Sequence, residues 1–243
     1  MGISVPVIGA PLLGSVEAWR EILRTQPDHL LALWRLNETA GTAVADSSGN
    51  GRSGTATGVT WVPAGPNGAR AASFDGVNDL VNVYSAGLAG AFNGDEGSLL
   101  LWCRAANADV WADGSFRRLV YFGADADNEI FCDKTNSGSV RLYREGDGTA
   151  DYASTDGAAL GTAWHCLAMT WSATADENRY YLDGALLDTD TGLGSWDGAL
   201  SNTLTTLGAY TTTPAMVWHG DLALVALWDT PLTGGEMAAL GGA

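Results

Sequence analysis

The hydrophobic positions of this chain predict one short helix followed by many short strands. Ser15 is a candidate N-cap, and the apolar residues from Val16 to Leu23 follow it at helical spacing. Pro27 ends this pattern, because proline interrupts a helix. We therefore expect a short amphipathic helix that packs on the rest of the protein or on a neighbouring subunit.

From residue 29 onward, short apolar runs alternate with clusters of Gly, Asn, Asp and Pro, which is typical of strands separated by turns. Asp183-Gly184 lies between two such runs and predicts a tight hairpin. The runs near residue 100 and at 165–171 are apolar on both faces, which predicts central strands covered on both sides. The expected strands are 31–36, 58–62, 71–74, 80–83, 98–104, 118–122, 129–132, 140–144, 164–171, 178–182, 185–188, 203–207 and 219–228.

No long linker, low-complexity stretch or fixed-period repeat divides the 243 residues. The 32 glycines and the low share of charged residues (16%) fit many short strands joined by glycine-rich turns. We expect an all-β fold in which two antiparallel sheets pack as a jelly-roll sandwich. The expected units are an extended arm and short helix over residues 1–28 and a jelly-roll domain over 29–243.

The net charge bears on whether the chain binds nucleic acid, and the cysteines bear on the compartment in which it folds. The formal net charge is −16 and Lys134 is the one lysine, so the chain is expected to repel the phosphates of nucleic acids. Cys103, Cys132 and Cys166 lie far apart in apolar runs, which favours buried free thiols over a metal site. Free thiols in turn indicate folding under reducing conditions.

The first residues carry no basic stretch ahead of their apolar ones, so we expect no secretion signal. The sequence also lacks the run of about 18 apolar residues that a membrane helix needs. These patterns predict a protein that folds in a cytoplasm and does not enter a membrane.

Six segments carry a family pattern in one order along the chain. They are AWREILRTQPDHLLALWRLNE, DSSGNGRSGT, GARAASFDGVNDLVNV, SLLLWCR, GTAWHCLAMTW with RYYLDGALL, and HGDLALVALWDTPLTGGEMAAL. Together they resemble the laminin-G-like, concanavalin A-like jelly rolls over about residues 17–240. The resemblance implies a two-sheet jelly roll that recognises carbohydrates, glycoconjugates or protein surfaces without catalysis.

Members of this family without a secretion signal are often virion proteins of phages. The leading hypothesis is therefore a non-catalytic structural or recognition protein on a phage virion, either decorating the capsid or carried on the tail. It would fold in the host cytoplasm and contact other virion proteins, further copies of itself or a cell-surface polysaccharide. A cellular, extracellular carbohydrate-binding module is the alternative, and a glucanase-like glycoside hydrolase is the third candidate.

The resemblance also implies a calcium site beside the DSSGNG loop. Asp46 matches the expected carboxylate and Asn50 the expected backbone or amide oxygen. The family commonly places an acid in the last strand where this chain has Ala223, and Asp221 shares the face of that position. Asp46, Asn50 and Asp221 are thus the candidate ligands for Ca²⁺, with a plain structural turn as the alternative.

Residues suited to catalysis do not form the expected pattern. Related jelly-roll glucanases carry Glu-x-Asp-x-x-Glu, whereas EIFCD beginning at Glu129 lacks the middle acid. The chain has no GxSxG motif, and its three histidines lie in different segments. We expect no enzyme activity, and we interpret the acids between residues 125 and 133 as a solvated loop.

Sugar recognition would depend on exposed aromatic rings, on which the CH faces of sugars stack. Trp111, Tyr152, Trp196 and Trp218 lie in or beside Gly/Asp-rich segments and are the candidate ligand-binding residues. Packing in the core or at a subunit interface is the alternative for each of them. The tryptophans in strand-like runs are expected in the core: Trp34, Trp61, Trp102, Trp164, Trp171 and Trp228.

Overall fold

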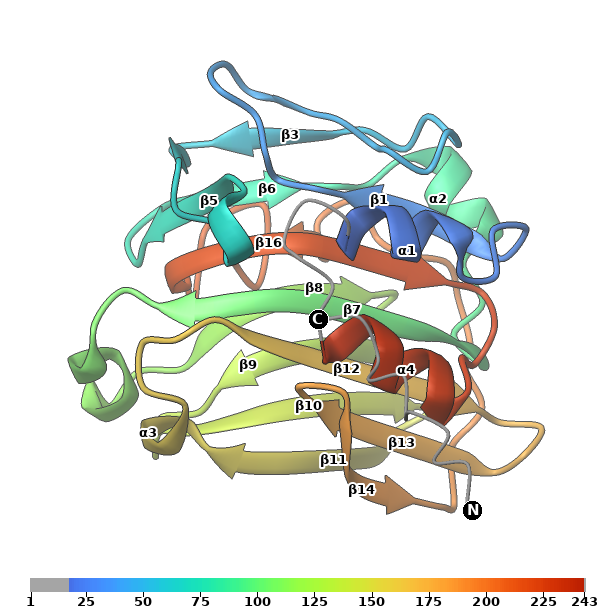
Figure 1. The fold of residues 1–243 in the computed structure, drawn as a ribbon. Coiled ribbons are helices and arrows are strands. Elements are labelled where there is room, and N and C mark those ends of the chain that lie inside the picture. Colours follow the sequence, from blue (N-terminus) through green and yellow to red (C-terminus); the bar gives the residue numbers. More distant parts are fainter. Residues whose placement is uncertain (1–17, 243) are drawn as a thin grey trace, which may run out of the picture.

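The computed structural model describes residues 18–242, which form two antiparallel sheets of eight strands each (Figure 1). This confirms the predicted all-β jelly-roll sandwich. In the first sheet, sheet A, seven strands lie in the order β14-β13-β12-β7-β16-β5-β4, and β1 also pairs with β16. Their bounds are β1 Leu30–Trp34, β4 Thr60–Val62, β5 Ala71–Asp75, β7 Glu96–Ala105, β12 His165–Ser172, β13 Glu177–Leu182, β14 Ala185–Asp190 and β16 His219–Trp228.

Sheet B has the strand order β11-β10-β9-β8-β15-β6-β3-β2. The strand β11 and the short strands β2 and β3 were not predicted from the sequence. The bounds are β2 Ala43–Val44, β3 Gly54–Thr57, β6 Leu80–Asn82, β8 Arg117–Gly123, β9 Glu129–Lys134, β10 Ser139–Gly146, β11 Thr149–Asp156 and β15 Thr205–Leu207.

The helices are short and lie between strands or at the ends of the described chain. They are α1 Ala18–Arg24, α2 Ala86–Ala91, α3 Gly157–Leu160 and α4 Gly234–Gly241, with 3-10 turns η1 Pro66–Gly68 and η2 Ala108–Ala112. The predicted N-terminal helix is present as α1. Its expected cap at Ser15 and the arm over residues 1–14 lie outside the described residues.

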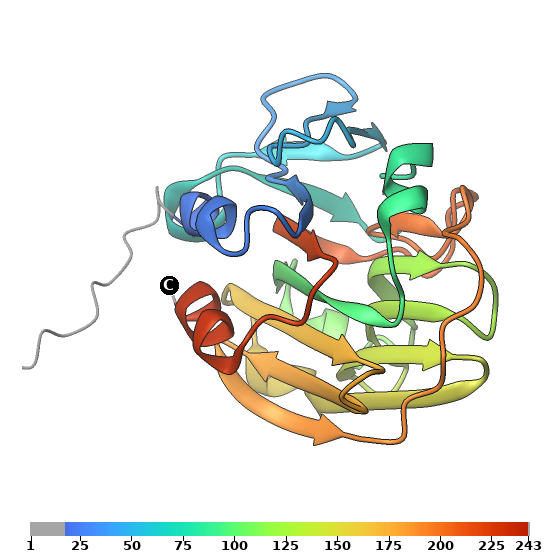
Figure 2. The same cartoon turned by 90° about the vertical axis from the view of Figure 1, so that its right-hand side faces the viewer.

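The main hydrophobic core fills the space between the two sheets. A second cluster lies on the outer face of sheet A, where α1 and α4 cover the strands (Figure 2). Successive residues of β7 serve both clusters, since Leu99 and Leu101 face sheet B while Leu100 and Trp102 face the helices. This double coverage explains why β7 and β12 lack an alternating pattern.

The turn between β13 and β14 is the predicted two-residue hairpin. Asp183 and Gly184 both have positive φ, at 50° and 76°. A two-residue turn with positive φ at both positions matches the right-handed twist of the paired strands, and the Asp-Gly pair suits it. The side chain of Asp183 also accepts a hydrogen bond from the backbone N–H of Cys166 at 2.8 Å, which fixes the hairpin against β12.

The three cysteines are free and buried within the described part of the sandwich, as predicted. Cys103 and Cys132 belong to the core between the sheets, and Cys166 faces the helices. Burial, the largest cause in each case, raises the thiol pKa of all three cysteines above its ordinary value. These thiols therefore behave as small apolar side chains.

The outer face of sheet B differs from that of sheet A because a loop, rather than a helix, crosses it. Residues 208–218 connect β15 to β16, and Ala209 and Val217 of this loop pack on Leu80. The loop divides the outer face into a part over β8–β11 and a part over β3 and β6. The first part carries aromatic and charged side chains, and the second carries uncharged polar and apolar ones.

Candidate functional site

Four aromatic rings form a row across β8–β11 on the outer face of sheet B. The rings of Tyr121, Phe131, Tyr143 and Tyr152 lie on directly paired positions of successive strands. Neighbouring ring centroids are 5.9, 4.3 and 6.2 Å apart, with interplanar angles of 18°, 13° and 21°. Because the rings stack, most of their faces are covered by one another. We call these four residues the aromatic row.

Tyr152 is the end of the aromatic row that is open to a ligand. It lies on β11, the edge strand of sheet B, and 51% of its surface is exposed. The other end is closed, since Tyr210 of the 208–218 loop meets Tyr121 edge-on at 4.8 Å. One ring face of Tyr152 lies toward Tyr143, so its second face is the one available for stacking.

Charged side chains flank the aromatic row along the strands. On one side, Glu129 and Glu145 are paired positions of β9 and β10. Tyr121 donates its hydroxyl hydrogen bond to Glu129, and Tyr143 donates to Glu145. Burial, the largest cause, raises the pKa of the Glu129 carboxyl, and the like charge of Glu145 adds to the rise.

On the other side of the aromatic row, two arginines share one buried carboxylate. Arg118 donates to Asp133, and Arg141 donates to it through Nε and Nη2 at 2.9 and 2.8 Å. Their guanidinium carbons lie 3.5 and 5.5 Å from the centroid of the Phe131 ring. This paired hydrogen bonding fixes the plane of Arg141 beside the aromatic row.

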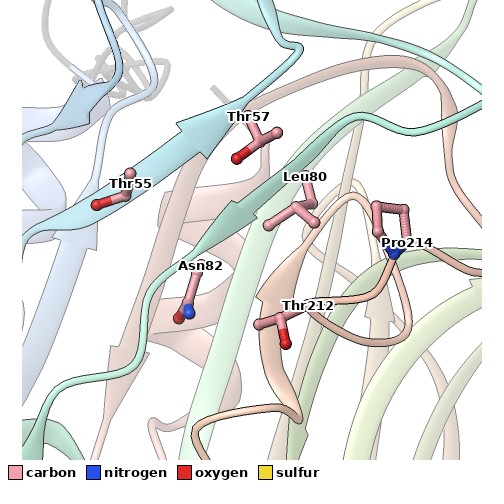
Figure 3. Close-up of a pocket in the computed structure, with 6 residues that line it drawn as sticks. All are labelled: Thr55, Thr57, Leu80, Asn82, Thr212 and Pro214. Atoms are coloured by element: carbon pink, nitrogen blue, oxygen red, sulfur yellow. The ribbon is translucent and has the colours of Figure 1, made fainter.

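A shallow pocket lies on the other side of the 208–218 loop, over β3 and β6 (Figure 3). Its volume is about 250 Å³. The lining is uncharged and combines hydroxyl, amide and apolar groups, from Thr55, Thr57, Leu80, Asn82, Thr212 and Pro214. The outer face of sheet B therefore offers a charged aromatic part and a neutral polar part.

The structure separates the four aromatic residues predicted to bind ligand. Tyr152 is exposed, but Trp218 is fully buried and Trp111 nearly so, with their rings 6.0 Å apart in the main core. Trp111 donates its indole hydrogen bond to the Gly161 carbonyl at 2.7 Å. Neither indole presents a face to solvent, so the prediction of a ligand platform is wrong for Trp111 and Trp218.

Trp196 is half-buried at the end of the sandwich and not on the outer face of sheet B. Its ring meets Phe92 edge-on at 5.4 Å and lies against Gly94, where an added Cβ would approach its Cδ2 to 1.9 Å. Its indole donates to the Gly198 carbonyl at 3.0 Å. These contacts give Trp196 a packing role, and none of them involves a residue of the aromatic row.

The DSSGNG loop is held together by the Asp46 carboxylate. Oδ1 accepts hydrogen bonds from the backbone N–H groups of Leu33 and Ser48 at 3.1 and 2.9 Å. Oδ2 accepts from the N–H of Arg52 at 2.9 Å. Asp46 thus links both ends of its own loop to β1. This is the role of a structural turn, which the sequence analysis gave as the alternative to a calcium site.

Two of the three side chains proposed to bind calcium have other partners. Asn50 turns its amide nitrogen, not its oxygen, toward the Leu30 and Leu31 carbonyls, at 2.8 and 3.1 Å. Asp221 is paired with Arg104 at 2.6 Å. Within residues 18–242, no group of three or more His, Cys, Asp or Glu side chains is placed to hold a metal ion. The side chains of Asn50 and Asp221 thus have other partners, and calcium binding at this loop stays a prediction.

Asp46→Ala is expected to lower the free energy of unfolding by about 2–3 kcal/mol, because three backbone N–H groups lose a charged acceptor. Because these N–H groups already occupy the Asp46 carboxylate, we also expect the unaltered protein to show the same Tm in millimolar CaCl₂ and in EDTA. Asp75→Ala is a suitable comparison, since Asp75 accepts one local hydrogen bond in an exposed turn. A rise of several degrees in Tm with Ca²⁺ would contradict this interpretation of the loop.

The acids between residues 125 and 133 are only partly a solvated loop. Asp125 and Asp127 lie in the turn before β9, but Glu129 and Asp133 belong to β9 itself. Asp133 is fully buried, contrary to the sequence interpretation. The sequence signal for this surface is the alternation of outward and buried positions in the strands. In β10, for example, Arg141, Tyr143 and Glu145 alternate with buried positions.

The fold and its sequence match a known superfamily. The Laminin_G_3 model, described as Concanavalin A-like lectin/glucanases superfamily, matches residues 88–238. The chain belongs to this superfamily. The matched segment includes β7–β16 and therefore the whole aromatic row. The resemblance predicted from the six sequence segments is thus confirmed.

Solved structures share the superfamily fold at low sequence identity. Domain 4 of AbnA, a GH43 extracellular arabinanase from Geobacillus stearothermophilus, was solved in complex with arabinotriose. It matches with a TM-score of 0.59 and 17% identity over 88% of this chain and 98% of that domain. The binding domain of Paraclostridial Mosquitocidal Protein 1 matches with a TM-score of 0.66 and 14% identity over 88% of this chain and 52% of its own.

The botulinum neurotoxin serotype D binding domain matches with a TM-score of 0.64 and 11% identity, over 90% of this chain and 52% of its own length. The chain thus spans about half the length of the two toxin domains. At these identities the likeness shows the fold alone. A search of curated proteins found no match. Among the described residues, no helix is long and apolar enough to cross a membrane.

Proposed function

We propose that this domain binds a glycan, without catalysis, on the outer face of sheet B. The observation that carries the proposal is the exposed ring of Tyr152 at the open end of the aromatic row. Charged side chains beside an accessible ring provide both the apolar surface and the hydrogen-bonding groups that a sugar needs. The arabinotriose in the related AbnA domain supports a sugar ligand for this fold.

A binding role is favoured over hydrolysis by the arrangement of the carboxylates. A glycosidase needs two carboxyl groups on either side of the scissile bond. Glu129 and Glu145 instead lie side by side on adjoining strands, each accepting a tyrosine hydroxyl. Phe131 occupies the outward position between Glu129 and Asp133, where the glucanase pattern has its middle acid. Unchanged polysaccharide after incubation with the protein would support the non-catalytic proposal, and release of reducing ends would contradict it.

Tyr152→Ala is expected to weaken glycan binding about tenfold, close to 1.4 kcal/mol, because the stacking surface is lost. Affinity electrophoresis through gels containing polysaccharide measures this directly. Leu186→Ala is the matched control, since Leu186 is also an exposed residue of an edge strand but lies in sheet A. Equal retardation of the unaltered protein and the Tyr152 variant on every glycan would refute the assigned surface.

We further propose that the domain is carried on a phage virion, as part of the capsid or tail. The buried free thiols support folding in a reducing cytoplasm, and the superfamily assignment is compatible with recognition of a cell-surface polysaccharide or a neighbouring virion protein. Mass spectrometry of purified particles tests this location, and light scattering tests self-association. Detection in a cell-wall or secreted fraction, with none in particles, would favour an extracellular carbohydrate-binding module.

A further inference from the structure

Basic side chains gather at one end of β8–β10, next to the aromatic row. Arg118 and Arg141 share the Asp133 carboxylate, while Arg117 and Lys134 share that of Asp113. These four make up a third of the 12 lysines and arginines in a chain whose net charge is −16. Asp156, exposed at the end of β11 on the face of Tyr152 and Ser154, is a third carboxylate at this end. Four cations and three carboxylates leave this end of the sheet with one excess positive charge.

Arg141 is the member of this group that a ligand on Tyr152 would meet. Its guanidinium carbon lies 6.0 Å from the centroid of the Tyr152 ring and 5.6 Å from that of Tyr143. Its Nε and Nη2 donate to Asp133, and Nη1 makes no hydrogen bond to any of residues 18–242. The guanidinium plane is therefore fixed before a ligand arrives, which lowers the entropic cost of using Nη1.

Arg118 contributes positive charge to this group rather than a donor that a ligand could reach. The residue is 8% exposed, and its buried Nε makes no hydrogen bond within the described chain. Asp133 must balance both guanidinium groups, so one positive charge of the pair is not neutralised. A further anion beside Arg141 would meet that excess charge.

The acidic side of the aromatic row lies at the opposite end of the same strands. Glu129 and Asp133 are four residues apart on β9, or about 13 Å at the usual rise of a strand. At physiological ionic strength this exceeds the screening length of about 8 Å. The side chains approach more closely than this backbone spacing, because the charges of Arg118 and Arg141 act to lower the pKa of the Glu129 carboxyl. A ligand group bonded to Arg141 Nη1 would nonetheless have Arg141 as its nearest charge.

We infer that the glycan carries an acidic group, a carboxylate or a sulfate ester, which accepts a hydrogen bond from Arg141 Nη1 while its sugar ring stacks on Tyr152. This inference rests on the proposed glycan-binding function and names the substrate class of the same surface. Ser154 pairs with Arg141 across β10 and β11 and is exposed, so the position between ring and guanidinium is lined by a small hydroxyl side chain.

The first test uses the unaltered protein and pairs of glycans that differ only in charge. Polygalacturonate is compared with its methyl ester, and dextran sulfate with dextran, by titration calorimetry in EDTA. We expect at least tenfold tighter binding of the charged member in one pair, and weakening of that binding as NaCl is raised. The pair that shows the difference distinguishes a carboxylate from a sulfate ester.

The second test uses variants on the two sides of the aromatic row. Arg141→Gln is expected to weaken binding of the charged glycan about tenfold and to leave the neutral member unchanged, whereas Glu145→Gln is expected to leave or improve it. Arg179→Gln is the matched control, because Arg179 likewise pairs with a carboxylate, that of Glu177, but lies on sheet A. Thermal unfolding of each variant checks that the protein is still folded when Asp133 has lost one of its arginine partners.

The outcomes separate this inference from the proposed function. Equal affinity for the charged and neutral members of both pairs would overturn the acidic class and leave glycan binding standing. Weaker binding after Glu145→Gln, with stronger binding after Arg141→Gln, would also overturn it and would indicate a cationic sugar. Binding that does not respond to Tyr152→Ala on any glycan would remove the proposed function itself.

Discussion

Asp133→Asn is expected to lower the free energy of unfolding by about 3–5 kcal/mol, because two buried or partly buried guanidinium groups lose their shared counter-charge. Asp133 is fully buried and accepts from both Arg118 and Arg141. The asparagine has nearly the same shape, so the loss reports charge rather than packing. Urea-induced unfolding followed by tryptophan fluorescence gives the free energy.

Asp127→Asn serves as the control for this experiment, since Asp127 lies exposed in the turn before β9. Its unfolding free energy is expected to stay within about 0.5 kcal/mol of the unaltered protein. A change of the same small size in Asp133→Asn would mean that the arginines find water or other acceptors without cost. The Arg118–Asp133–Arg141 group would then be of little consequence for stability.

Trp218→Ala is expected to destabilise the domain by about 3–5 kcal/mol, through lost burial and the cavity left between the sheets. Trp218 is completely buried and packs against Trp111. At temperatures where the variant is still folded, its glycan affinity is expected to equal that of the unaltered protein. Affinity loss without loss of stability would instead restore Trp218 as a ligand-binding residue.

The strands with large apolar residues could be predicted from the sequence, whereas the polar edge could not. β7, β12 and β16 are apolar on both faces and were placed close to their observed bounds. β11 was not expected, because TADYASTD is mostly polar with small residues. As an edge strand it is specified by pairing with β10 rather than by its own hydrophobic pattern.

The candidate site was found only at Tyr152. A sequence places tryptophans in Gly/Asp-rich segments but does not show that Trp111 and Trp218 turn inward to meet each other. The aromatic row joins residues from four strands, so its members have no common motif along the chain. The DSSGNG segment likewise marked the fold correctly, while the hydrogen bonds that occupy Asp46 depend on its contact with β1.

The burial of the cysteines and of Lys134 leaves the described surface without an accessible thiol or lysine amine. Reagents aimed at those groups would therefore leave the outer face of sheet B unmodified. A single cysteine introduced at an exposed position of sheet A, such as Leu186, would be a unique attachment point for a dye or sensor surface. Glycan binding could then be followed with every copy held in the same orientation.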